Sequence, residues 1–180
     1  AGLTKVTVSL HGPNADVHDW ITRRKHAFGQ TFRGLRHLAE LKARYGFHFK
    51  LNTTIVKGNV HLMRDMAGIA AELGVDNINF NVVEVRGNAV ELFDSVVPRY
   101  VEVMDHADSS DLDFYDATCS LSRVPACAGG VDWVQETWHV AHKGALDRYN
   151  ADAGKTKGQL CEQCWINGRC SGIWQHYIER

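Results

Sequence analysis

The chain has 180 residues, of which 44% are hydrophobic and 23% are charged, and its formal net charge at pH 7 is -1. These values are typical of a globular protein and exclude the strongly basic surface that nucleic-acid-binding domains carry. No apolar run approaches the roughly 20 residues that a membrane-spanning helix needs. We therefore expect neither a nucleic acid nor a membrane as a partner.

The cysteine content bears on the cellular compartment. The five cysteines are an odd number, and no secretory signal peptide opens the sequence. Stable disulfide frameworks belong to oxidising compartments and usually use an even number of cysteines. We therefore expect a cytoplasmic protein.

Strands and helices alternate over the first part of the chain. Segments rich in β-branched and aromatic residues are predicted to be strands, over residues 3–10, 47–56 and 77–85. Apolar residues at helical spacing predict helices over residues 31–44, 61–73 and 97–107. A shorter helical turn is predicted over residues 16–20. Asp16 is the predicted N-cap of this turn, and Asn59 is a predicted cap of the second helix.

This alternation predicts right-handed βαβ units and a parallel sheet, so the predicted fold class is α/β. The pattern changes after residue 110. A further strand is predicted over residues 112–116, and a β-hairpin is predicted from residues 133–140 and 145–149. We divide the chain into a partial α/β barrel, residues 1–110, and a cysteine-bearing extension, residues 111–180.

Polar side chains are found at the end of each predicted strand: Ser9 and His11, Asn52 and Thr54, and Asn81 and Glu84. In parallel α/β sheets, ligands bind at the carboxyl ends of the strands. Polar groups that converge there can bind a small polar ligand. Each residue alone is equally compatible with a solvated loop position or a local cap. The repeated placement therefore carries this prediction more than any single residue.

Three cysteines near the end of the chain, Cys161, Cys164 and Cys170, are spaced C-x2-C-x5-C. A C-x-x-C pair can place two thiolates on one metal ion or iron–sulfur cluster. A fourth thiol is available from Cys127 or from Cys119. The alternatives are a disulfide within the C-x-x-C pair and three unrelated thiols. Thiolate ligands alone do not distinguish zinc from an iron–sulfur cluster.

Several motifs, in this order, resemble the radical S-adenosylmethionine (SAM) enzymes. Residues 8–13, VSLHGP, and residues 18–22, HDWIT, are similar to the fourth strand of that superfamily and to the loop after it. Residues 51–56 resemble the fifth strand, and residues 80–89 resemble the sixth. The tail, with Cys127 and the three later cysteines, is similar to auxiliary-cluster extensions of the SPASM or twitch type.

The resemblance implies a partial (β/α) barrel of the TIM type, whose strand ends hold SAM. It assigns polar contacts with SAM to Ser9 and Asn52. Together with the other polar residues at the strand ends, the predicted SAM-binding residues are Ser9, His11, Asn52, Asn81 and Glu84. The segment of residues 81–85 would lie near the adenine.

The resemblance also implies a second cofactor in the extension. An auxiliary [4Fe–4S] cluster would be held by four thiolates: Cys127, Cys161, Cys164 and Cys170. Cys119 is the competing fourth ligand. In such enzymes a separate cluster reduces SAM to a 5′-deoxyadenosyl radical, which abstracts a hydrogen atom from the substrate. The auxiliary cluster relays electrons or binds substrate. By analogy with these relatives, we expect a peptide or protein as the substrate, with a small metabolite as the alternative.

One departure from the superfamily pattern is large. The C-x3-C-x2-C motif that holds the SAM-reducing cluster is absent from this sequence, as are counterparts of the first three strands. We therefore expect the chain to be the C-terminal half of a radical SAM protein, inactive without the N-terminal half of the barrel. One alternative is a binding or scaffold module with a structural zinc, held by the tail cysteines with Cys127 or His176. Another is a degenerate barrel that serves protein interaction alone.

Overall fold

The computed structural model describes residues 2–112, 118–125, 127, 154–165, 167–168, 170 and 172–179. The first part of the chain alternates strands and helices: β1 (Lys5–Ser9), α1 (Ala15–Thr22), α2 (Ala27–Tyr45), β2 (His48–Ile55), η1 (Val60–Leu62), α3 (Met63–Glu72), β3 (Asn77–Val82), α4 (Asn88–Glu91), α5 (Phe93–Val96), α6 (Tyr100–Ser109) and β4 (Cys119–Ser122). The described part of the tail contains the short elements β5 (Lys155–Thr156), η4 (Gln159–Gln163), β6 (Ile173–Trp174) and η5 (Gln175–Tyr177). Within these residues, no helix combines the length and the apolar character needed to cross a bilayer.

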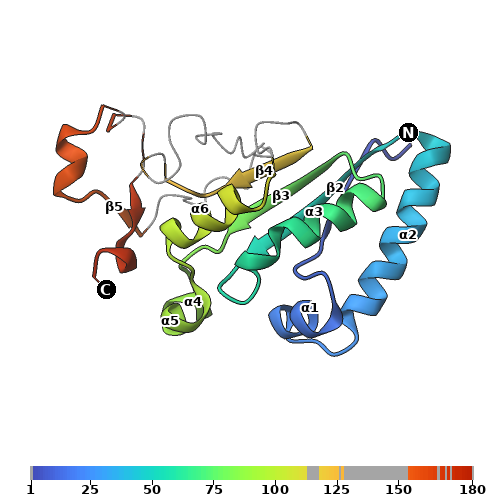
Figure 1. Ribbon diagram of the computed structural model, residues 1–180, viewed down its shortest axis with the longest axis horizontal. Coiled ribbons are helices and arrows are strands. Elements are labelled where there is room, and N and C mark those ends of the chain that lie inside the picture. Colours follow the sequence, from blue (N-terminus) through green and yellow to red (C-terminus); the bar gives the residue numbers. More distant parts are fainter. Residues whose placement is uncertain are drawn as a thin grey trace.

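Four strands form one parallel sheet in the order β1-β2-β3-β4 (Figure 1). The α/β class and the parallel sheet predicted from the sequence are confirmed. The three predicted strands are present, although β3 ends at Val82, three residues before the predicted end at residue 85. Closure of the sheet toward a barrel stays a prediction.

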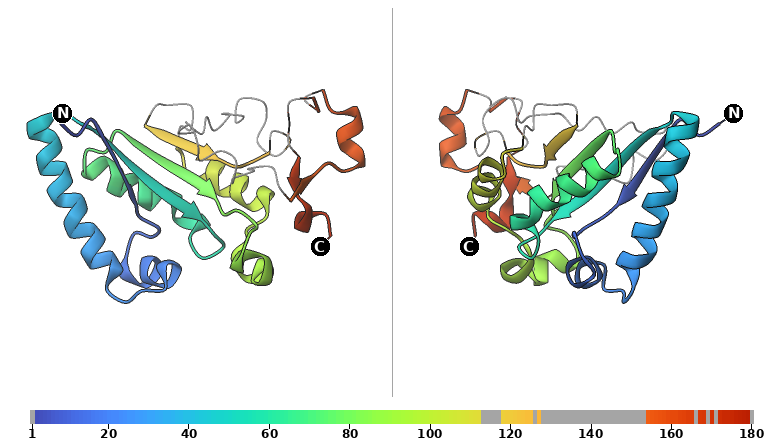
Figure 2. Two further views of the ribbon diagram at one scale, coloured as in Figure 1. Left: turned by 180° about the vertical axis from the view of Figure 1, so that it is seen from behind. Right: turned by 45° about the vertical axis from the view of Figure 1, so that its right-hand side comes forward.

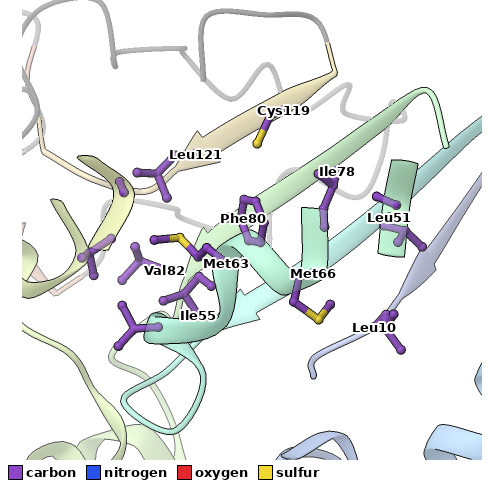
Figure 3. Close-up of a cluster of buried hydrophobic side chains, with 14 of the residues drawn as sticks. Leu10, Leu51, Ile55, Met63, Met66, Ile78, Phe80, Val82, Cys119 and Leu121 are labelled. Atoms are coloured by element: carbon purple, nitrogen blue, oxygen red, sulfur yellow. The ribbon is translucent and has the colours of Figure 1, made fainter. Parts of the chain in front are cut away.

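One face of the sheet carries the hydrophobic core. The buried strand side chains on this face include Leu51 and Ile55 of β2, Ile78, Phe80 and Val82 of β3, and Leu121 of β4 (Figure 3). Helices α2, α3 and α6 cover this face and add Leu35, Met63, Met66 and Val103 to the same cluster. Because side chains alternate along a strand, the intervening residues project from the opposite face.

The opposite face of the sheet is polar. The strand register aligns Ser9 with Asn52, Asn52 with Asn79, and Asn79 with Ser120, so four short polar side chains form a row across all four strands. A second row, closer to the carboxyl ends, consists of Thr54, Asn81 and Ser122. The sequence pattern of apolar and polar residues therefore divides the sheet into a packing face and a face of amides and hydroxyls.

The helix starts differ from those predicted. Helix α1 is capped by Asn14, whose side chain accepts a 3.1 Å hydrogen bond from Val17 N, so Asp16 lies in the first turn and is not the cap. Helix α2 begins at Ala27, before the predicted start at residue 31. Its start is fixed by Asp19, whose carboxylate accepts the backbone N–H groups of His26 and Phe28 at 2.5 and 2.7 Å.

Short helices occupy the segment between β3 and α6. Helices α4 and α5 were not predicted, and α6 begins at Tyr100, after the predicted start at residue 97. Pro98 explains the later start, because the residue before a proline is disfavoured in the helical region, and Val97 is accordingly extended. Helices α1, α4 and α5 lie toward the end of the sheet to which the strand arrows point (Figures 1 and 2).

The sheet extends past residue 110, the boundary predicted between the two parts. Strand β4 pairs in parallel with β3, from Ile78↔Cys119 to Asn81↔Ser122. Leu112 is not in a strand, and the rest of the predicted strand over residues 112–116 lies outside the described residues, as does the predicted hairpin of residues 133–140 and 145–149.

The tail packs onto the end of the sheet through aromatic residues. Trp174 is buried in a small cluster with Val85, Phe93 and Val97. The ring of Tyr177 stacks on Tyr100 with centroids 4.3 Å apart, and its hydroxyl donates a 2.7 Å hydrogen bond to the carbonyl of Pro98. The cysteine-bearing tail is thereby held against α5 and the start of α6.

Candidate functional site

Three of the predicted ligand contacts are neighbours on the polar face. Ser9 and Asn52 are register partners on β1 and β2. The amide Nδ2 of Asn81 on β3 donates a hydrogen bond to Oδ1 of Asn52. Ser9 is exposed, whereas Asn81 is only 6% exposed. The structure therefore brings these three side chains together across three strands.

Asn79 lies beside this group and was not singled out from the sequence. Its Oδ1 accepts hydrogen bonds from the hydroxyls of Ser120 and Ser122, at 3.0 and 2.8 Å. These two bonds fix the amide plane of Asn79. The polar face is thus an ordered array of side-chain amides and not a set of independent solvated groups.

His11 lies in the loop after β1 and is held by backbone groups. Its Nδ1 accepts a 3.1 Å hydrogen bond from Thr54 N, and its own backbone N–H donates to Nδ1 of His18 at 3.0 Å. Each acceptor nitrogen must be unprotonated, so both rings are held as the tautomer with hydrogen on Nε2. Burial, together with the nearby His18, lowers the pKa of His11 to about 4. His11 is therefore neutral at physiological pH.

Asn59 joins the loops that follow β1 and β2. Its side chain is 1% exposed, its Oδ1 accepts Val56 N at 2.8 Å, and its Nδ2 donates to the carbonyls of His11 and Thr54, each at 2.8 Å. Asn59 is at the N-cap position of η1, as predicted, but its side chain makes no capping bond to the turn that follows. Its role is to connect the two loops at the carboxyl ends of the strands.

Glu84 follows β3 and lies between two arginines. Its carboxylate is 3.1 Å from a guanidinium nitrogen of Arg123 and 3.7 Å from Nε of Arg86. Arg123 comes directly after β4, so this ion pair joins the ends of two neighbouring strands. The sequence singled out Glu84 but not Arg123, which lies 39 residues further along and meets Glu84 only through the pairing of β3 with β4.

A cavity of about 330 Å³ opens at the same end of the sheet. Its walls include Thr54 and Val56 at the end of β2, Val83 after β3, Ala89 of α4, and the indole of Trp20 from α1. None of the five predicted SAM contacts is among the described residues that line it. Its volume is within the range of small-molecule sites, and its largely apolar walls with one aromatic ring suit a planar organic group.

The position of Trp20 depends on a glycine. A Cβ atom placed on Gly58 would lie 2.8 Å from Cζ3 of the Trp20 indole, closer than carbon atoms can approach. The indole is 56% exposed, so one face packs on the loop after β2 while much of the ring stays accessible. Trp20 was not singled out as a site residue from the sequence, because its neighbours come from separate segments.

The cysteines occupy two different environments. Cys119 is 5% exposed on β4 and belongs to the main core beside Ile78 and Leu121. Burial raises the pKa of the Cys127 thiol, and the electrostatic effects of Cys170, Cys161 and Cys164 act in the same direction. All five cysteines are among the described residues, and none forms a disulfide bond.

The tail has local features that suit a thiolate site. Cys164 N donates to the carbonyl of Cys161 at 3.2 Å, which closes a tight turn between the two thiols, and Gly172 N donates to Sγ of Cys170 at 3.3 Å. Within the described part of the chain, however, no three His, Cys, Asp or Glu side chains are close enough together to hold a metal ion. The four thiols are of the right chemical type, but the described residues show no coordination geometry for them.

Comparison with known proteins found curated relatives of part of this chain. No protein-family model matches the chain. Three curated relatives share the name AdoMet-dependent heme synthase: 28% identical over 132 residues in Nitratidesulfovibrio vulgaris, 28% over 132 residues in Oleidesulfovibrio alaskensis, and 34% over 74 residues in Methanosarcina barkeri. The first two matches cover 71% of this chain, and the third covers 41%. The matched part is 33%, 31% and 20% of the respective relatives, so the chain spans about a third or less of their length. These AdoMet-dependent relatives support a place for the chain in the radical SAM superfamily.

Proposed function

We propose that this chain is the C-terminal portion of a radical SAM enzyme and that it binds SAM at the carboxyl ends of β1, β2 and β3. The observation that carries the proposal is the cavity of about 330 Å³ at that edge of the sheet. Thr54, which lines the cavity, is the register partner of Asn81, whose amide is hydrogen-bonded to Asn52. The AdoMet dependence in the names of the three relatives supports it.

Of the parts of SAM, the adenine is the one that we assign to the cavity. Val56, Val83 and Ala89 supply aliphatic surface, and the Trp20 indole supplies a ring on which a base can stack. This assignment puts the adenine close to the segment of residues 81–85 named by the superfamily resemblance. The polar groups of SAM would then reach out of the cavity toward the strand ends.

The polar contacts are assigned to the strand-end residues. Ser9 and Asn52 are proposed to bind the ribose or amino-acid part of SAM, and Asn81 holds the Asn52 amide in place. His11 offers one fixed donor, Nε2–H, because its Nδ1 already accepts Thr54 N. Glu84 is proposed to contribute through the ion pairs that it makes with Arg86 and Arg123.

An auxiliary [4Fe–4S] cluster is proposed for the tail, held by Cys127, Cys161, Cys164 and Cys170. A thiolate donor set of this kind suits such a cluster, which would relay electrons or bind substrate. Cys119 is the less suitable fourth ligand, because it is buried in the hydrophobic core on β4. A structural zinc held by the same thiolates is the competing occupant.

The substrate has two candidate classes. The auxiliary-cluster resemblance favours a peptide or protein, whereas the names of the relatives, heme synthases, favour a tetrapyrrole. In either case the sequence lacks the C-x3-C-x2-C motif that holds the SAM-reducing cluster. Turnover is therefore proposed to need a further polypeptide segment that supplies this motif and completes the sheet beside β1.

Calorimetric titration of the purified chain with SAM tests the central part of this proposal. We expect binding that is lost or strongly weakened in Trp20→Ala, whose ring lines the cavity. Trp165→Ala is the matched control, because that tryptophan is 75% exposed on the tail. Equal SAM affinity in the Trp20→Ala variant and the wild type would rule out the cavity as the adenine site.

A further inference from the structure

His18 connects helix α1 to the loop that follows β1. Its Nδ1 accepts the backbone N–H of His11 at 3.0 Å, and its ring stacks on the His11 ring with centroids 5.7 Å apart and planes 14° apart. Phe28, at the start of α2, makes an edge contact with the same ring, with centroids 6.1 Å apart. His18 is 2% exposed. This imidazole is therefore a buried contact between three segments of the chain.

Helix α1 also packs closely on this loop through its backbone. A Cβ atom on Gly12 would lie 2.6 Å from Cβ and from Cγ1 of Val17, and 2.8 Å from the backbone nitrogen of His18. A side chain at residue 12 would therefore force α1 away from the loop. The direction of α1 relative to the end of β1 is thus set by the close approach at Gly12 and by the hydrogen bond to His18.

The same helix carries one wall of the cavity assigned to adenine. Trp20 and Ile21 of α1 line this cavity. Backbone hydrogen bonds between successive turns make a helix move as a unit. A change in the way that His18 packs on the loop therefore moves the Trp20 indole as well.

His18 also orients a polar residue of the proposed SAM site. Nδ1 of His11 accepts Thr54 N at 3.1 Å, and Thr54 lines the cavity at the end of β2. The hydrogen bond to His18 fixes the backbone of His11, and the stacked rings restrict the rotation of its imidazole. The remaining donor of His11, Nε2–H, consequently has a defined direction.

We propose that His18 is a positioning residue of the SAM site, which holds the Trp20 ring and the His11 donor in the arrangement that binds SAM. The inference rests on the proposed function, because it takes the cavity and His11 as parts of that site. His18 is not among the described residues that line the cavity, so it acts through its neighbours.

This role requires His18 to be neutral, because a protonated Nδ1 cannot accept the N–H of His11. Burial lowers the pKa of His18, and nearby Asp19 opposes this effect. The N–H groups of Phe28 and His26 lower the pKa of Asp19, so its carboxylate stays charged. Uncharged neighbours from β2 and α2 also contact the histidine pair: Thr54 and Phe28. Protonation of His18 therefore releases α1, and SAM affinity should fall as the pH drops below about 6.5.

Calorimetric titration of the purified chain with SAM tests the role of His18. His18→Ala removes the acceptor and should weaken SAM binding about tenfold at pH 7. His18→Asn supplies an amide oxygen as the acceptor in place of Nδ1 and should restore the affinity to within about threefold of the wild type. His37→Ala, at an exposed position of α2, is the matched control and should bind SAM like the wild type.

The pH profile distinguishes this role from a general loss of stability. Wild-type affinity should fall severalfold between pH 7 and pH 5.5, a range in which the carboxylate of SAM stays ionised. The decline should be smaller in His18→Asn, because an amide does not titrate, and this result decides the case if His18→Ala does not fold. Equal SAM affinity in His18→Ala and the wild type, or an equal decline in His18→Asn and the wild type, would overturn the inference.

A measurement without SAM separates this inference from the proposed function. When 5-fluorotryptophan replaces the five tryptophans, the ¹⁹F resonance of Trp20 can be assigned by its loss in Trp20→Phe. This resonance should shift in His18→Ala and return toward its wild-type position in His18→Asn. Such a shift in a chain that does not bind SAM supports the link between His18 and Trp20 and removes the proposed SAM function. SAM binding with an unchanged resonance and affinity in His18→Ala removes the positioning role alone.

Discussion

Gly58 and Trp20 pack so closely that a Cβ atom on Gly58 would lie 2.8 Å from the indole. Because Trp20 lines the proposed adenine cavity, this contact links a loop glycine to cofactor binding. Replacement of Gly58 by alanine must displace the ring. We expect Gly58→Ala to lower SAM affinity about fivefold, the effect of losing an aromatic contact worth about 1 kcal/mol.

Calorimetric titration with SAM measures this effect. Gly68→Ala is the control, since a Cβ at that position of α3 meets no atom within 4 Å. Unchanged affinity in Gly58→Ala would show that the Trp20 ring does not bind the cofactor.

Asn59 should be among the residues whose loss costs most stability. Its side chain makes three hydrogen bonds, to Val56 N and to the carbonyls of His11 and Thr54, and it is 1% exposed. We expect Asn59→Ala to lower the free energy of unfolding by about 3 kcal/mol, because the partners stay buried without bonds. Urea denaturation gives the value. Asn88→Ala, in the exposed first turn of α4, should change it by less than about 0.5 kcal/mol.

Because the pKa of His11 is low in the folded protein, we expect the free energy of unfolding to depend on pH. Folding lowers that pKa from 6.5 to about 4, so between these values the unfolded chain binds the additional proton. Stability should therefore be complete above pH 6.5 and fall as the pH drops toward 4, by up to about 3 kcal/mol. Burial also lowers the pKa of His18, which acts in the same direction, while nearby Asp19 opposes it.

Urea denaturation at pH 7 and at pH 5 measures this slope. His11→Asn removes the titrating group and should flatten the decline. A slope that is the same in the variant would show that other groups cause it.

Gly172 should be essential for the tail. Its φ is +88°, and a Cβ there would lie 2.1 Å from the carbonyl oxygen of Thr156, which pairs with the next residue, Ile173, between β5 and β6. We expect Gly172→Ala to break this pairing and to reduce iron incorporation at the tail cysteines severalfold after anaerobic reconstitution. Gly168→Ala, where a Cβ meets no atom within 4 Å, should incorporate iron like the wild type. Equal iron in both variants would contradict a role for the pair in shaping the site.

The parts of the fold that the sequence predicted depend on local pattern. Alternating Val and Thr residues in β1 and the apolar stripes of α2 and α3 are signals within single segments, and a parallel sheet follows from their order. Strand β4 was missed because CSLS has no β-branched residue. It forms a strand because its backbone pairs in parallel with β3. Helices α4 and α5 have four residues each, too short for a helical period to show.

The candidate site was predictable only in part, because part of it depends on contacts between segments that are far apart in the sequence. Ser9, Asn52 and Asn81 could be found from their positions at strand ends, and the sheet brings them together. Trp20 and Arg123 were not identified, since each meets its partner through tertiary contacts. Asn14 competed with Asp16 as the helix cap, and both residue types are good caps. In each of these examples the role of the residue depends on its contacts in the folded structure and not on its residue type.

Analysis of iron, acid-labile sulfide and zinc in anaerobically purified chain, with Cys164→Ala beside it, tests the radical SAM account most directly. The account predicts about four irons and four sulfides per chain, lost in the variant, as expected for a thiolate-bound [4Fe–4S] cluster. Cys119→Ala should keep them, because that thiol lies in the core. One zinc per chain without sulfide would contradict the redox role of the tail and would leave a structural zinc module in its place.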